Sequence, residues 1–91
     1  LPRGTDWTRY ADALEHACGT IAQARPDLLV VSFGADTFAG DPISGFALQR
    51  EDFARMAARI SALGLSTVIV MEGGYAVDDL GGNVATFLGG F

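Results

Sequence analysis

Apolar residues recur along this chain at the spacing of helix faces in some stretches and as continuous runs in others. The first helical spacing runs through Trp7, Tyr10, Leu14, Ala17, Cys18 and Ile21. Thr5 or Asp6 is suited to cap the start of this helix, and Pro26 ends it. A second amphipathic helix is predicted by Phe53, Met56, Ala57, Ile60 and Leu63, with Gly64 as its C-terminal stop.

Two short runs are apolar without alternation, which is typical of parallel strands covered on both faces. They are residues 28–33, LLVVSF, and residues 66–71, STVIVM. After the second run, Asp78 can cap a third helix, which is predicted to carry an apolar side made of Leu80, Val84, Phe87 and Leu88. The chain is therefore predicted to alternate helix, strand, helix, strand, helix.

This order predicts an α/β fold in which the two strands are parallel and joined by a right-handed helical crossover. Both strands then end at the same edge of the sheet, so that Asp36 and Tyr75, which follow them, come to one crevice. Two buried parallel strands need further strands beside them and cover on both faces. We therefore expect residues 1–91 to be the C-terminal part of a larger α/β sheet whose other strands are not in this sequence.

Composition narrows the candidate functions. The chain is 49% hydrophobic with a mean hydropathy of +0.29. This apolar content is high for a domain of 91 residues, which can bury only a thin core. Its net charge of -5 and the lack of any lysine disfavour nucleic-acid binding and are compatible with a cationic substrate. The single cysteine, Cys18, excludes an internal disulfide and fits a reducing, cytoplasmic setting. No apolar run approaches the ~20 residues of a membrane span.

The candidate chemistry lies in the two loops that follow the strands. Asp36 could be a metal ligand or a carboxylate that caps its own loop, and Asp41 is interpreted as a turn former. Tyr75 could be an exposed phenol or a packed aromatic residue. The Gly-Gly pair before it could cradle a phosphate, but no glycine-rich nucleotide motif accompanies it. His16 is assigned to a solvated helix face and Cys18 to the core.

Two strings of residues make the resemblance to a known family specific. GADTFAGDP, residues 34–42, and EGGY, residues 72–75, resemble the C-terminal signatures of the zinc-dependent histone deacetylase and acetylpolyamine amidohydrolase superfamily. The flanking sequences LPRGT and GGNVATFLGGF are also similar to sequences of that family. The motifs DPIS and MEGGY resemble those of its acetylpolyamine amidohydrolase branch. The resemblance implies a C-terminal βαβ-type portion of a larger three-layer parallel-sheet fold of the arginase/deacetylase kind. Residues 1–91 would then be the C-terminal segment of a single deacetylase-type catalytic domain whose N-terminal part is missing from this sequence.

The same resemblance implies a role for individual residues. Asp36 would be one protein ligand of a single catalytic Zn²⁺, and Tyr75 would be the catalytic hydroxyl that polarises the substrate amide. Ile43, Gly73 and Gly74 would lie along the substrate channel. The family's Asp-x-His ligands and its paired histidines are absent from this chain, and His16 matches neither. We therefore expect the isolated chain to be inactive.

The implied function is a zinc-dependent amidohydrolase that removes acetyl groups from acetylated polyamines or similar small acylated amines. The alternatives are a protein-lysine deacetylase, a non-catalytic α/β interaction module and, more remotely, a nucleotide-binding domain. The expected partners are a small acetylated amine and the remaining part of the catalytic domain, with no nucleic acid and no membrane. A homodimer is left open.

Overall fold

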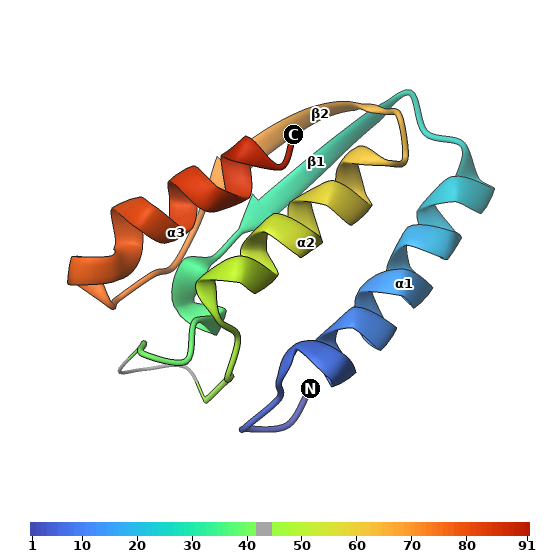
Figure 1. The fold of residues 1–91 in the computed structure, drawn as a ribbon. Helices are drawn as coiled ribbons and strands as arrows, with labels where there is room; N and C mark the ends of the chain where they lie inside the picture. The colour runs from blue at the N-terminus through green and yellow to red at the C-terminus, as the bar shows by residue number, and fades with distance from the viewer. Residues whose placement is uncertain (42–44) are drawn as a thin grey trace.

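The computed structural model describes residues 1–41 and 45–91 of the chain. The order of the elements follows the sequence-based prediction (Figure 1). They are α1 (Trp7–Ala24), β1 (Leu28–Phe33), the single-turn helix η1 (Ala35–Thr37), α2 (Arg50–Ser61), β2 (Ser66–Met71) and α3 (Val77–Gly89). Among the residues described, no helix has the length and apolar character that crossing a membrane requires.

Local signals explain the bounds of α1. Its cap is Asp6, whose side chain accepts a hydrogen bond from the backbone N–H of Arg9 at 3.3 Å. The helix ends where Arg25 adopts a left-handed conformation, directly before Pro26. The predicted cap and stop of this helix are both confirmed.

The start of α2 is fixed by a reciprocal capping arrangement. Gln49 is the N-cap, and its backbone N–H donates to the carboxylate of Asp52 at 2.8 Å while its own side chain accepts from the third residue of the helix. Asp52 is buried and also pairs with Arg55 at 2.5 Å. The helix ends at Ser61 with Ala62 as its cap, so Leu63, predicted to be helical, lies in the following turn. Gly64, the predicted stop, comes after that turn with a φ of 69°, which suits glycine.

The predicted start of α3 is wrong by two residues. The cap is Ala76 rather than Asp78, because the carbonyl of Ala76 already accepts a hydrogen bond from the N–H of Asp79 at 3.0 Å. Asp78 and Asp79 instead lie in the first turn, where their negative charge is favourable beside the positive end of the helix dipole. Arg50 reaches across from α2 and pairs with Asp79 at 3.2 Å and with the buried Asn83 at 3.0 Å.

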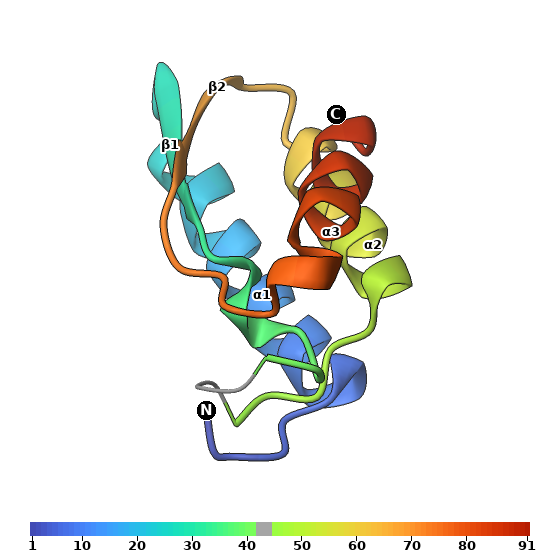
Figure 2. The same ribbon diagram turned by 90° about the vertical axis from the view of Figure 1, so that its left-hand side faces the viewer.

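The strands pair in parallel, as the connection predicted. The register runs from Leu28 opposite Ser66 to Phe33 opposite Met71. Helices α2 and α3 lie together on one side of this pair in Figure 2, and α1 lies beside α2 in Figure 1. The carboxyl ends of both strands therefore meet at one edge of the sheet.

Aromatic packing joins the covered face of the sheet to the helices. Phe33 of β1 stacks on Phe87 of α3, with ring centroids 3.9 Å apart, and meets Phe53 of α2 edge-on at 5.7 Å. Phe53 and Phe87 are fully buried. Because aromatic rings bury large apolar areas, their burial contributes strongly to the stability of this small core.

The opposite face of the sheet departs from the prediction that both faces are covered. Val30, Val68 and Val70 remain 58%, 48% and 43% exposed, respectively. The reason is that the described helices pack against the other face, so alternate side chains of each strand point to solvent. This chain therefore presents one apolar sheet face that it does not cover with its own described residues.

Candidate functional site

The loops after β1 and β2 are joined to each other by backbone hydrogen bonds. The N–H of Glu72 donates to the carbonyl of Phe33 at 2.8 Å, and the N–H of Ala35 donates to the carbonyl of Gly73 at 2.9 Å. These bonds continue the parallel ladder past the ends of the strands. The prediction that the two loops lie side by side at one edge of the sheet is confirmed.

The carboxylate of Asp36 lies in a notch formed by two glycines. A Cβ atom built on Gly34 would lie 2.5 Å from Oδ1 of Asp36, and one built on Gly73 would lie 2.8 Å from Oδ2. A side chain at either position would force the carboxylate to move, so glycine at both positions leaves the room that Asp36 occupies here. Within the described ranges 1–41 and 45–91, no group donates a hydrogen bond to the Asp36 side chain. The described residues therefore do not support the alternative in which this carboxylate caps its own loop.

Tyr75 lies next to the same notch and remains 46% exposed. Its ring atom Cε2 is 3.4 Å from the point where a Cβ of Gly73 would lie, so Asp36 and Tyr75 approach Gly73 from the same side. Gly74, between Gly73 and Tyr75 in sequence, has a φ of 152° that other residues rarely adopt, and a Cβ there would lie 2.7 Å from the side chain of Leu80. The predicted juxtaposition of carboxylate and phenol is therefore present.

Asp41 has a contact that the sequence did not predict. It is 6% exposed, and its Oδ2 accepts a hydrogen bond from the backbone N–H of Tyr75 at 2.6 Å. Its own N–H donates to the carbonyl of Phe38 at 3.0 Å, which bears out its interpretation as a turn former. No sequence signal nearby marks the bond to Tyr75, because it joins two loops through a side chain and a backbone group.

Tyr10 of α1 is a second residue that the sequence placed only on an apolar helix face. Burial raises the pKa of the Tyr10 phenol above its ordinary value, and the negative charge of Asp36 raises this pKa further. Its hydroxyl faces the sulfur of Met56 at 3.9 Å. Tyr10 therefore stays a neutral phenol, and the Asp36 charge extends its influence to α1.

Of the other residues that the sequence singled out, Ile43 lies outside the described residues. His16 is exposed on α1, as expected for a solvated position. Cys18 is buried in the core, and burial raises the pKa of its thiol, which disfavours a reactive thiolate.

The described residues contain no cluster of three or more His, Cys, Asp or Glu side chains that could hold a metal ion by themselves. A carboxylate oxygen is a chemically suitable zinc ligand, and the glycine notch leaves room for that of Asp36. The chain therefore offers one fitting ligand, and a complete zinc site would need others from elsewhere.

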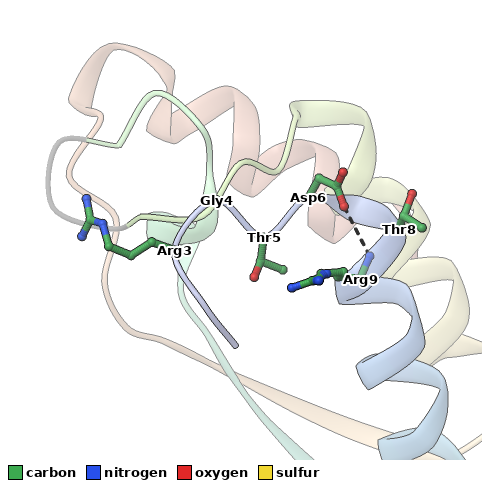
Figure 3. Close-up of a pocket in the computed structure, with 6 residues that line it drawn as sticks. All are labelled: Arg3, Gly4, Thr5, Asp6, Thr8 and Arg9. Atoms are coloured by element: carbon green, nitrogen blue, oxygen red, sulfur yellow. Dashed lines mark hydrogen bonds between the residues drawn. The ribbon is translucent and has the colours of Figure 1, made fainter.

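A separate hollow of about 350 Å³ lies at the start of α1, away from this notch (Figure 3). It is lined by Arg3, Gly4, Thr5, Asp6, Thr8 and Arg9. Figure 3 shows Arg3 and Arg9 on opposite sides of Thr5, so their guanidinium groups do not converge on one point. The segment is tied to the body of the chain by Thr5, whose carbonyl accepts from the N–H of Ala47 at 2.7 Å.

Comparison with known proteins gives a consistent result. The family model of the histone deacetylase domain matches residues 1–91. Acetylpolyamine amidohydrolase 1 of Pseudomonas aeruginosa is 47% identical over 91 residues, which is 100% of this chain and 26% of that protein. Acetylpolyamine amidohydrolase of Mycoplana ramosa is 43% identical over 90 residues, which is 99% of this chain and 26% of that protein.

Among solved structures, the acetylpolyamine aminohydrolase from Burkholderia pseudomallei superposes with a TM-score of 0.95 at 37% identity. The match covers 100% of this chain and 27% of that one. The chain thus spans about a quarter of the length of the relatives that it matches. On the family match and these identities, the chain belongs to the histone deacetylase domain family, and its fold is the C-terminal part of the fold seen in that structure.

Proposed function

We propose that this chain is the C-terminal segment of a zinc-dependent amidohydrolase that removes acetyl groups from acetylated polyamines or similar small acylated amines. The observation that carries the proposal is the approach of Asp36 and Tyr75 to the same side of Gly73, at the carboxyl edge of a parallel sheet. A carboxylate and a phenol placed together there match the two requirements of metal-assisted amide hydrolysis, a ligand and an oxyanion donor.

Asp36 is the residue of this chain that would hold zinc. When bound, the ion would polarise the amide carbonyl and lower the pKa of a water molecule to about 7. The contribution of Asp36 is a carboxylate oxygen, for which Gly34 and Gly73 leave room because they carry no side chains. The remaining ligands and the general base would come from the N-terminal part of the same domain.

Tyr75 would donate its hydroxyl proton in a hydrogen bond to the substrate carbonyl oxygen. That bond strengthens as negative charge develops on the oxygen, so it stabilises the transition state more than the bound substrate. Tyr75 is 46% exposed in this chain, so the described residues leave part of its side chain open to a substrate. Gly73 and Gly74 would allow the substrate chain to pass close to the backbone, and Ile43 would form part of the channel wall.

The substrate class follows from the relatives and from charge. Two of the relatives compared are named acetylpolyamine amidohydrolases, and a net charge of -5 is favourable for attracting a cationic polyamine. The alternative that the family name supports is a protein-lysine deacetylase. A cytoplasmic location belongs to the same proposal.

The proposal also accounts for the exposed sheet face. Val30, Val68 and Val70 form an apolar surface that the rest of the catalytic domain would cover. Parallel sheets of this kind are stable when both faces are covered and each strand has neighbours.

The test is hydrolysis by the complete protein, loaded with zinc, of an N-acetylated diamine and of an acetyl-lysine peptide. We expect kcat/KM for the acetylated diamine to exceed that for the peptide by at least about tenfold, and activity to disappear with a chelator and return with zinc. A preference for the peptide would instead support a protein-lysine deacetylase. If the zinc-loaded protein hydrolyses neither substrate, the chain belongs to a non-catalytic module.

A further inference from the structure

Asp41 makes a contact that the proposed catalytic roles do not explain. Its carboxylate, 6% exposed, accepts a hydrogen bond from the backbone N–H of Tyr75 at 2.6 Å, across 34 positions of sequence. Burying a carboxylate is costly unless donors satisfy it, and a short bond from an N–H is one such compensation. The contact therefore links a buried carboxyl group directly to the backbone of the candidate oxyanion donor.

The loop that carries Tyr75 has few other means of fixing that residue. Gly73 and Gly74 precede it without side chains, and Ala76 follows it as a helix cap without a side-chain hydrogen bond. The backbone bond from Ala35 to Gly73 fixes the loop two residues earlier, and α3 begins two residues later. The bond from Asp41 acts at Tyr75 itself.

Asp41 is in turn well supported. Its backbone N–H bonds to Phe38, and the N–H of Ala39 donates to the carbonyl of Leu48 at 2.7 Å. Phe38 forms an isolated parallel bridge with Leu48, which is fully buried. The ring of Phe38 also covers Gly40, where a Cβ would lie 2.8 Å from the ring. The carboxylate of Asp41 is therefore anchored to the core rather than to a free loop.

We infer that Asp41 is a positioning residue, which holds the backbone of Tyr75 so that its hydroxyl meets the substrate carbonyl. This inference rests on the proposed function, because it assigns Asp41 no role other than through Tyr75. Displacement of a catalytic group by about 1 Å can cost about 10²-fold in rate. Loss of the hydrogen bond between Asp41 and Tyr75 should thus lower kcat, while the zinc content of the protein and KM change little.

A double-mutant cycle in the complete, zinc-loaded protein tests this link. We expect Asp41→Ala to lower kcat by about 10- to 100-fold, and Asp41→Asn, which keeps an acceptor oxygen, to recover most of that loss. In a Tyr75→Phe background, Asp41→Ala should lower kcat by less than about threefold, because the hydroxyl it positions is already absent. Asp78→Ala is the matched control, since Asp78 is an exposed carboxylate three positions after Tyr75, in the first turn of α3.

The outcomes separate the inference from the proposed function. If Tyr75→Phe alone leaves kcat unchanged, the role of Tyr75 fails and the inference fails with it. If Tyr75→Phe lowers kcat but Asp41→Ala lowers it again by the same factor in both backgrounds, only the inference is overturned. An Asp41→Asn variant as slow as Asp41→Ala would also overturn it, because the accepted hydrogen bond would then not be what matters.

Hydrogen exchange of the wild-type protein gives a test that does not depend on a variant folding. The amide of Tyr75 should exchange at least about tenfold more slowly than the amide of the exposed Asp78, because Asp41 accepts its hydrogen. An amide of Tyr75 that exchanges as fast as an unstructured peptide would overturn the inference.

Discussion

The carboxyl edge of the sheet is held by contacts within this chain, whereas one face of the same sheet is not covered by its described residues. At the edge, backbone bonds and the glycine notch bring Asp36, Asp41 and Tyr75 into fixed relation using residues of this chain alone. On the face, Val30 and Val68 remain exposed with no described element over them. The chain therefore carries a preorganised part of a site on a sheet that is only half covered.

The difference indicates that the geometry of the two loops and the stability of the sheet depend on different interactions. The edge is shaped by local hydrogen bonds and close glycine contacts, which form over short distances within two loops. The stability of a parallel sheet depends on covering large apolar surfaces, at about 25 cal/mol per Å². Changes at the edge should therefore affect chemistry, and changes to the cover of the face should affect folding.

The largest effect is expected when the chain is separated from the rest of its domain. Residues 1–91 expressed alone should show no deacetylase activity and should be molten, aggregated or oligomeric, because the apolar sheet face and the strand edges lie open. Thermal melting and sedimentation of the purified chain measure this. A monomer with a sharp cooperative melt would show that the chain is a self-sufficient domain, contrary to the proposed boundaries.

The next largest effect concerns the charge at the edge. Asp36→Asn in the complete protein should weaken zinc binding by more than about 100-fold, because even groups that only orient a ligand change metal affinity by about 10- to 100-fold. Bound zinc is measured after dialysis against a chelator, with Asp12→Asn, an exposed carboxylate on α1, as the control. Equal zinc content in the wild type and Asp36→Asn would exclude Asp36 as a ligand.

A smaller effect is expected when the fit between the loops is disturbed without removing any chemical group. Gly73→Ala places a Cβ against Asp36 and Tyr75 together, so kcat/KM should fall by about 10²-fold. Gly81→Ala is the matched control, because a Cβ there has nothing within 4 Å and lies in α3. That control should keep full activity and gain up to about 1 kcal/mol in the free energy of unfolding. Full activity in Gly73→Ala would show that the notch is not part of the site.

The sequence was sufficient where structure is determined by neighbouring residues. The continuous apolar runs predicted both strands with their observed bounds, and the cap at Asp6 and the stop at Pro26 bounded α1. The prediction of Asp78 as the cap of α3 was wrong. An acidic residue near a helix start is favourable both at the cap and in the first turn, so its presence does not fix the first helical residue. The preceding backbone, which the sequence does not specify, decided between them.

Contacts between distant segments were the other part that the sequence could not supply. Strand order brought Asp36 and Tyr75 to one edge, because parallel strands end together. The hydrogen bond from Tyr75 to Asp41 depends on the path of a loop, and the influence of Asp36 on Tyr10 depends on how α1 packs. The continuous apolar strands predicted two covered faces, and the described residues of the chain cover one of them.

The hydroxyl of Tyr75 tests the account most directly, in the complete, zinc-loaded protein. Tyr75→Phe keeps the ring and removes the one group proposed to stabilise the oxyanion, so kcat on an N-acetylated diamine should fall by about 10²–10³-fold with zinc content and melting temperature unchanged. Tyr75→Ala should be equally slow, because the ring is 46% exposed and contributes little to the core. A Tyr75→Phe variant that turns over as fast as the wild type would contradict the central claim.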